Sequence, residues 1–124
     1  MLNARALGLA TVVGTILQVA MVLLGHTAPA VASLFAVGGM GISLLAGLAY
    51  AYWARESRAS SAAAGGAIAG AACALIGIFV SYLLGDVPAS LLALGTISSA
   101  VTGAVGGVVG RLLYRAAPGR AAAG

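Results

Sequence analysis

The chain has 124 residues, of which 62% are hydrophobic and only 6% are charged. A soluble domain carries roughly 25% charged residues, so these values exclude a soluble globular fold, because too few charges remain to cover its surface. Disorder requires low hydrophobicity and high charge, and a disulfide scaffold requires more than the single cysteine present. The class that remains is a protein that lies in a lipid bilayer, and the mean hydropathy of +1.13 fits that class.

Four apolar runs are long enough to cross a bilayer, which takes about 20 helical residues. We predict a single integral membrane domain over residues 1–124, with spans at residues 6–25, 29–53, 62–84 and 88–114. The predicted fold class is an all-α membrane protein, a four-transmembrane-helix bundle.

The first span is followed by Ala28-Pro29-Ala30, which imitates the cleavage site of a signal peptide. The apolar run is about 20 residues, longer than the roughly 7–15 of a signal sequence, and a proline between the two alanines disfavours cleavage. We therefore expect the first span to remain in the protein.

The breaks between the later spans have the residues that end and start helices. Pro29 and Pro88 stand at expected helix starts, and Gly85 follows the end of the third span. The only strongly polar stretch lies between the second and third spans, where Ser60 or Ser61 is expected to cap the third helix.

The positive charges predict the direction of the spans. The sequence has six arginines and no lysine, and all of them fall on one side of a four-span chain: Arg5, Arg55, Arg58, Arg111, Arg115 and Arg120. The positive-inside rule then predicts that both termini and the basic tail 115–124 are cytoplasmic, with the chain in a bacterial inner membrane. Aromatic residues near the arginines are expected to form an interfacial belt: Tyr50, Tyr52, Trp53 and Tyr114. This distribution excludes a nucleic-acid-binding surface, which needs a solvated basic patch.

A shift of 60 residues aligns the two halves of the chain. It places Leu23-Leu24-Gly25 on Leu83-Leu84-Gly85 and Arg55 on Arg115. One interpretation is a duplication that gives two parallel helical hairpins, related by an axis along the membrane normal. The other is that any two helical hairpins share such breaks.

Small residues recur at spacing four and therefore share helix faces. Because lipid is as apolar as leucine, close packing of such faces holds membrane helices together. The residues expected to pack in this way are Gly39, Ser43, Gly47, Gly66, Gly70, Gly103, Gly106, Gly107 and Gly110. They serve either the packing of one bundle or an interface between copies, or they line a narrow pore.

The chemistry available to the chain is limited. There is one His, one Cys, one Asp and one Glu, so we expect no catalytic constellation, no metal site and no cofactor. No charged residue lies in the middle of a predicted span, which argues against proton-coupled transport. Cys73 is expected to be a small apolar filler.

Polar residues inside the first and fourth spans allow two interpretations. They form hydrogen bonds between helices, or they line a pore or a site for a small ligand: Gln18, Thr15, Ser98, Ser99 and Thr102. Matching positions in the two outer turns hold His26 and Asp86. These two residues are either solvated or approach one another as a pair across the hairpins.

The order of features resembles that of small, uncharacterised four-span bacterial membrane protein families rich in Gly and Ala. The resemblance rests on the basic loop 55–58, the segment 64–70 and the segment 103–110. It implies no activity that could be carried over, and the sequence does not resemble a fluoride channel or a small multidrug exporter.

These observations predict a protein that is not an enzyme. We expect a structural or accessory component of the membrane, alone or in a larger complex, with the lipid bilayer as its surroundings. The alternatives are a homo-oligomeric channel or small transporter lined by Gly, Ser and Thr, and a holin-like protein that permeabilises the membrane.

Overall fold

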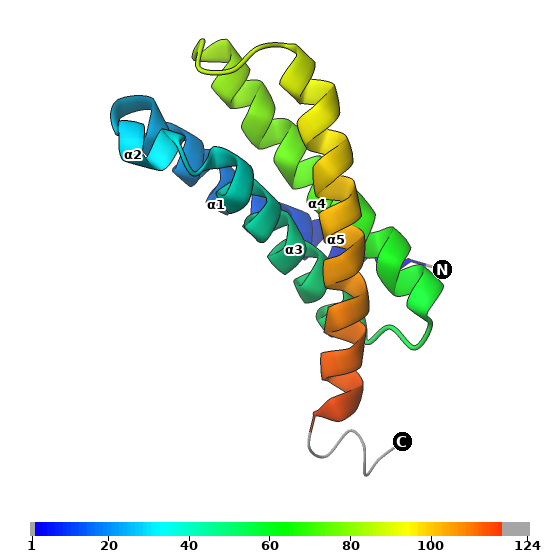
Figure 1. Ribbon diagram of the computed structural model, residues 1–124. Coiled ribbons are helices and arrows are strands. Elements are labelled where there is room, and N and C mark those ends of the chain that lie inside the picture. The colour runs from blue at the N-terminus through cyan, green and yellow to red at the C-terminus, as the bar shows by residue number, and fades with distance from the viewer. Residues whose placement is uncertain (1, 118–124) are drawn as a thin grey trace.

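The computed structural model describes residues 2–117, and within them the chain forms helices and no strand. Four helices are long and apolar enough to cross a membrane: α1 (Ala4–Thr27), α3 (Phe35–Ala54), α4 (Ala59–Leu83) and α5 (Ser90–Ala116). A short helix, α2 (Pro29–Ala32), lies between α1 and α3 (Figure 1). The predicted four-span, all-α bundle is therefore confirmed. The end of the predicted basic tail, residues 118–124, lies outside the described residues.

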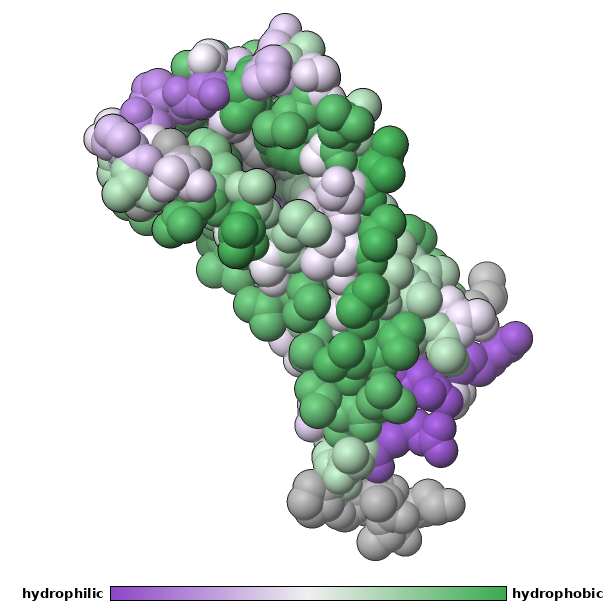
Figure 2. Space-filling view, in the orientation of Figure 1, coloured by the Kyte–Doolittle hydropathy of each residue, from purple (hydrophilic) through white to green (hydrophobic). Residues whose placement is uncertain are grey.

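The surface has the distribution that a membrane protein needs. Figure 2 shows an apolar band between two ends at which polar residues gather. One end carries Arg5, Arg55, Arg58, Arg111 and Arg115 and is called the arginine end below. The opposite end carries the turns with His26 and Asp86 and is called the turn end.

The second span begins later than the sequence predicts. Ala28 precedes a proline and is extended (φ −124°, ψ 100°), as such residues usually are. The helix that starts at Pro29 lasts four residues, and the Ser33 hydroxyl then donates to the carbonyl of Ala30 at 2.7 Å. Such local bonding competes with a continuous helix. The spanning helix α3 starts at Phe35 and has 20 residues, about 30 Å, which still crosses a hydrocarbon core.

The prediction that Ser60 or Ser61 caps the third span is wrong. Arg58 is extended (φ −112°, ψ 133°) and takes the N-cap position without a side-chain hydrogen bond. Ser60 and Ser61 consequently lie inside the first turn of α4.

Glycines let the backbones of α3, α4 and α5 touch near the middle of the bundle. A Cβ atom on Gly103 of α5 would overlap the carbonyl oxygen of Gly66 on α4, and one on Gly47 of α3 would overlap the carbonyl oxygen of Gly103. The Ser43 hydroxyl donates to the carbonyl of Gly70 at 3.3 Å and links α3 to α4 at the same level. We call this contact the glycine crossing.

The other small residues of the predicted packing set extend this contact. Gly106 and Gly110 lie against the backbone of α3 at Leu44 and Leu48, whereas Gly107 lies against Ala62 of α4. The fourth span therefore serves two neighbours from two adjacent faces. The structure places the predicted small residues at helix contacts within one chain, which is the first of the three uses that their spacing left open.

Helix α1 packs on the opposite side of the bundle from α5. It contacts α3 and α4, and Gly14 fits against the side chains of Cys73 and Ala46. Ala6 and Ala10, one and two turns before Gly14, are also buried.

The two hairpins, α1 with α3 and α4 with α5, turn at the same end of the bundle (Figure 1). Their contacts are nevertheless unequal. Helix α3 packs along α4, whereas α1 and α5 form no comparable interface within the described residues. A two-fold axis would make those two pairs equivalent, so the packing departs from two-fold symmetry, and the duplication of the sequence stays a hypothesis.

Hydrogen bonds close the arginine end. The Tyr50 hydroxyl donates to Glu56 at 2.7 Å and accepts from the backbone N–H of Asn3 at 3.1 Å. Tyr50 is fully buried, with its ring against Gly65, so it is not part of the predicted interfacial belt. The guanidinium of Arg111 donates two hydrogen bonds, at 2.9 and 3.1 Å, to the carbonyl of Ser57.

Candidate functional site

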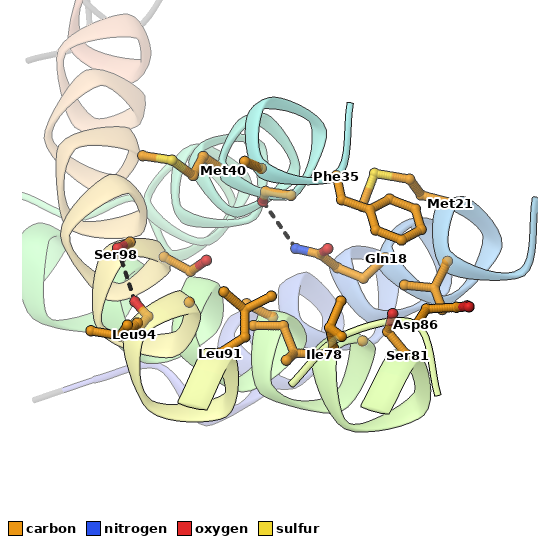
Figure 3. Close-up of a pocket in the computed structure, with 18 of the residues that line it drawn as sticks. Gln18, Met21, Phe35, Met40, Ile78, Ser81, Asp86, Leu91, Leu94 and Ser98 are labelled. Carbon is orange, nitrogen blue, oxygen red and sulfur yellow. Dashed lines mark hydrogen bonds between the residues drawn. The ribbon is translucent and has the colours of Figure 1, made fainter. Parts of the chain in front are cut away.

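A cavity of about 530 Å³ lies between the two hairpins and runs from the turn end toward the glycine crossing. Its walls come from α1, α3, α4 and α5 (Figure 3). Most of the wall is apolar, with the largest side chains being Met21, Phe35, Met40, Ile78 and Leu91. Its volume is in the range of pockets that hold small molecules, about 300–1,000 Å³.

Gln18 forms the polar base of this cavity. Its side chain is only 3% exposed. The amide nitrogen donates to the carbonyl of Gly39 at 3.0 Å and reaches the Ser43 hydroxyl at 3.3 Å and the Cys73 sulfur at 3.9 Å (Figure 3 shows the first). Both amide hydrogens are thereby committed. The amide oxygen lies between Gly39 and Gly77, and it accepts no hydrogen bond within the described part of the chain.

Cys73 belongs to the same polar group. Its thiol donates to the carbonyl of Gly70 at 3.3 Å and accepts from Gln18. The cysteine fills a small space against Gly14, as the sequence suggests, but it is also part of the hydrogen bonding at the centre of the bundle.

Ser81 adds a second polar group to the cavity wall. The side chain is 2% exposed, and its hydroxyl has no hydrogen-bond partner among the described residues. Ser81 lies four positions after Gly77, which touches Gln18, so Ser81 and Gly77 lie on one face of α4 about one turn apart. A buried hydroxyl without a partner carries a desolvation penalty of about 1–3 kcal/mol, which a bound hydrogen-bonding group would remove.

Some of the polar residues predicted to line a site do line the cavity, and others lie outside it. Gln18, Ser98 and Ser99 line the cavity. Thr102 does not, and its hydroxyl donates to the carbonyl of Ser98 in its own helix at 2.8 Å. Thr15 is also outside the cavity, and its hydroxyl is buried without a partner in the described chain.

The two outer turns are joined by a direct contact. His26 Nδ1 lies 2.8 Å from a carboxylate oxygen of Asp86, so the structure brings together the two residues that matching positions suggested. Asp86 also contributes to the cavity wall. The pair therefore stands at the turn end of the cavity and connects one hairpin to the other.

Ser81 was missed by the sequence interpretation. A signal was present, because Ser81 continues the small-residue face of α4 through Gly70, Ala74 and Gly77. The apolar wall had no such signal, since Met21, Phe35 and Met40 do not differ in sequence from residues that face lipid. These side chains line one cavity only because the two hairpins diverge toward the turn end.

Comparison of the chain with protein-family models, with curated proteins and with solved structures finds no match. Among residues 2–117 no three His, Cys, Asp or Glu side chains form a group that could hold a metal ion. The function is therefore argued from the bundle and its cavity.

Proposed function

We propose that the protein is a non-enzymatic integral membrane protein that serves as a structural or accessory component of a larger membrane complex. The observation that carries the proposal is Gly41, an exposed residue inside α3. A Cβ atom there would meet nothing within 4 Å. Glycine inside a helix is destabilising by roughly 0.5–1 kcal/mol relative to alanine, and no contact within residues 2–117 uses its small size. Glycines in membrane helices allow a second helix to approach closely, so a helix of another subunit accounts for this one.

The build of the bundle supports the same proposal. The glycine crossing joins three helices through backbone contacts, and the arginine end is tied by Tyr50 and Arg111. A bundle held in this way suits a fixed part of an assembly. The proposal includes a bacterial inner membrane with the arginine end in the cytoplasm, which the position of the positive charges supports.

The test compares substitutions at open and closed glycines. Wild-type protein and the Gly41→Leu variant are extracted from their own membrane directly into lipid nanodiscs, and their masses are measured by native mass spectrometry. We expect a stoichiometric hetero-complex for the wild type. For Gly41→Leu we expect a free chain whose thermal midpoint is not lowered, because leucine is a better helix former than glycine. Val12→Leu is the control because Val12 is also exposed, on α1, but already carries a branched side chain, so this substitution keeps the complex.

A wild-type chain that emerges alone would refute the accessory role. A complex that survives Gly41→Leu, while Gly103→Leu removes it by breaking the glycine crossing and with it the fold, would refute the contact at Gly41 that carries the proposal.

The cavity favours a second candidate, a small transporter. Its deepest wall residue on α5 is Ser99, one turn before Gly103, so it ends at the glycine crossing. A cavity that lies in the turn-end half of the bundle and stops at mid-span is what one state of a transporter requires. Solute and ion flux in liposomes separates the candidates, because a homo-oligomer with flux favours the transporter or a channel, and a hetero-complex without flux favours the accessory role.

A further inference from the structure

The cavity holds two buried polar groups whose bonding is incomplete, and no feature of an accessory role uses them. The Gln18 amide oxygen accepts no hydrogen bond, and the Ser81 hydroxyl has no partner, within residues 2–117. Both side chains are at least nine-tenths buried and line the cavity. Figure 3 shows them on neighbouring walls, Gln18 from α1 and Ser81 from α4, and these two helices are in contact.

From this geometry we infer that the cavity is a binding site for a small, neutral, mainly apolar molecule that carries one hydrogen-bond donor, such as a phenol or an alcohol. The donor requirement follows from Gln18. Because both amide hydrogens are used by groups on α3 and α4, only an acceptor remains for a ligand. The Ser81 hydroxyl both donates and accepts, so the hydroxyl of the ligand donates to Gln18 and exchanges a second hydrogen bond with Ser81.

The charges of the residues that line the cavity favour an electrically neutral ligand. Asp86 is the one charged side chain among the lining residues, and His26 lies against its carboxylate at 2.8 Å. A cation buried in the cavity would lack a free counter-charge, and an anion would face Asp86 and the Gln18 oxygen. The remaining wall consists of Met, Phe, Leu and Ile side chains together with small residues, which suits an apolar body.

The size of the ligand follows from the volume. At about 530 Å³ the cavity accepts a molecule of one or two rings with room to spare. A lipid acyl chain is the competing occupant, and it differs in one respect, because it would leave Gln18 and Ser81 without hydrogen bonds.

The experiment uses a pair of aromatic probes in which the O–H of one is replaced by O–CH3 in the other, which removes the hydrogen-bond donor and adds one methyl group. 2-Naphthol and 2-methoxynaphthalene are dialysed to equilibrium against the full-length protein in phosphatidylcholine nanodiscs, with empty nanodiscs to subtract partition into lipid. We expect saturable binding of 2-naphthol at one molecule per protein, and binding of 2-methoxynaphthalene weaker by about tenfold, since its ether cannot donate to Gln18.

Variants locate the site. Ser81→Ala removes the hydroxyl and, because that hydroxyl is unpartnered, keeps or raises the thermal midpoint. We expect this variant to bind 2-naphthol about fivefold more weakly than the wild type does, and to bind 2-methoxynaphthalene with unchanged affinity. Thr96→Val is the matched control, since the Thr96 hydroxyl is likewise buried and unpartnered but lies outside the cavity; it changes neither probe. Ser98→Phe fills the cavity and removes the binding of both.

Three results would overturn the inference. Binding that does not saturate above empty nanodiscs shows that the cavity takes no ligand of this class. Equal affinity for the two probes, or an unchanged affinity in Ser81→Ala, assigns the space to apolar chains such as those of lipids. None of these results affects the accessory role, which is tested at Gly41.

Discussion

A single methyl group at Gly103 is enough to test the glycine crossing. Its Cβ atom would overlap the carbonyl oxygen of Gly66 and lie 3.1 Å from the Cα atom of Gly70. These are backbone atoms, which cannot move aside as a flexible side chain can. We expect Gly103→Ala to lower the free energy of unfolding by about 1–3 kcal/mol, as overpacking does.

The measurement is the thermal midpoint in mild detergent. Gly41→Ala is the matched control, because its Cβ atom meets nothing within 4 Å, and alanine is the better helix former by up to about 1 kcal/mol. The two substitutions should therefore move the midpoint in opposite directions. Equal midpoints for both variants would show that the helices do not touch at Gly103.

Arg55 has a backbone conformation that suits glycine. It follows α3 with φ 55° and ψ 46°, in the left-handed region, and its N–H bonds back to α3. A residue with a Cβ atom pays about 1–2 kcal/mol in that region. We expect Arg55→Gly to raise the free energy of unfolding by about 1 kcal/mol, measured by chemical denaturation in detergent.

The control for the lost charge is Arg58→Gly. Arg58 has an ordinary extended backbone, so its substitution removes the same charge without relieving strain. If both variants gain the same stability, the effect belongs to the charge and not to the backbone of Arg55.

Three chain segments meet at the hydroxyl of Tyr50, namely the start of α1, the body of α3 and the loop before α4. The bonds are those to Asn3 and Glu56. Asn3 in turn caps α1 by accepting from the N–H of Ala6 at 3.0 Å. We expect Tyr50→Phe to lower the free energy of unfolding by about 1–3 kcal/mol, because the N–H of Asn3 and the carboxylate of Glu56 lose their hydrogen bonds to the hydroxyl.

Hydrogen exchange checks this at the level of the helices. Tyr50→Phe should speed exchange in the first turns of α1, whereas exchange at the turn end stays unchanged. Tyr82→Phe is the control, since Tyr82 is exposed on α4. Equal exchange in α1 for both variants would contradict a role of Tyr50 in holding the start of α1.

The sequence predicts those features of the helices that depend on periodic spacing or on neighbouring residues. Small residues at spacing four share a face whatever the neighbour is, so the faces through Gly66 and Gly103 could be identified without a structure. The late start of α3 depends on the Ser33 hydroxyl bond, and a hydroxyl makes such a bond only in some contexts. Tyr50 looked like its aromatic neighbours, and only the position of Gly65 opposite its ring decides that it is buried.

The cavity was less predictable, because it arises from how two hairpins diverge. Gln18 was evident as a polar residue inside a span, but its three acceptors come from two other helices. The pairing of His26 with Asp86 was one of two options in the sequence, since equal positions in two hairpins meet only if the hairpins pack with their turns together. Ser81 required knowledge of which face of α4 remains uncovered near its end.

The molecule as a whole has one positive end, and its direction in the membrane can be measured. We expect the arginine end to be cytoplasmic. In a Cys73→Ala background, a membrane-impermeant maleimide added to intact cells should label Thr27→Cys and not Ser57→Cys. Labelling of both after the cells are opened is the control for reactivity. The reverse pattern in intact cells would invert the topology.

The glycine crossing has a mechanical consequence for the bundle. It lies between an end tied by Tyr50 and Arg111 and an end where, within residues 2–117, one polar contact joins the hairpins beyond the cavity, that of His26 with Asp86. A partly exposed pair of this kind is worth about 0–1 kcal/mol. The glycine crossing can therefore act as a hinge between the two hairpins, because the arginine end is held together and the turn end is not. Small rotations about this hinge would change the separation of the hairpins at the turn end, where the cavity lies, and would leave the packing at the crossing intact.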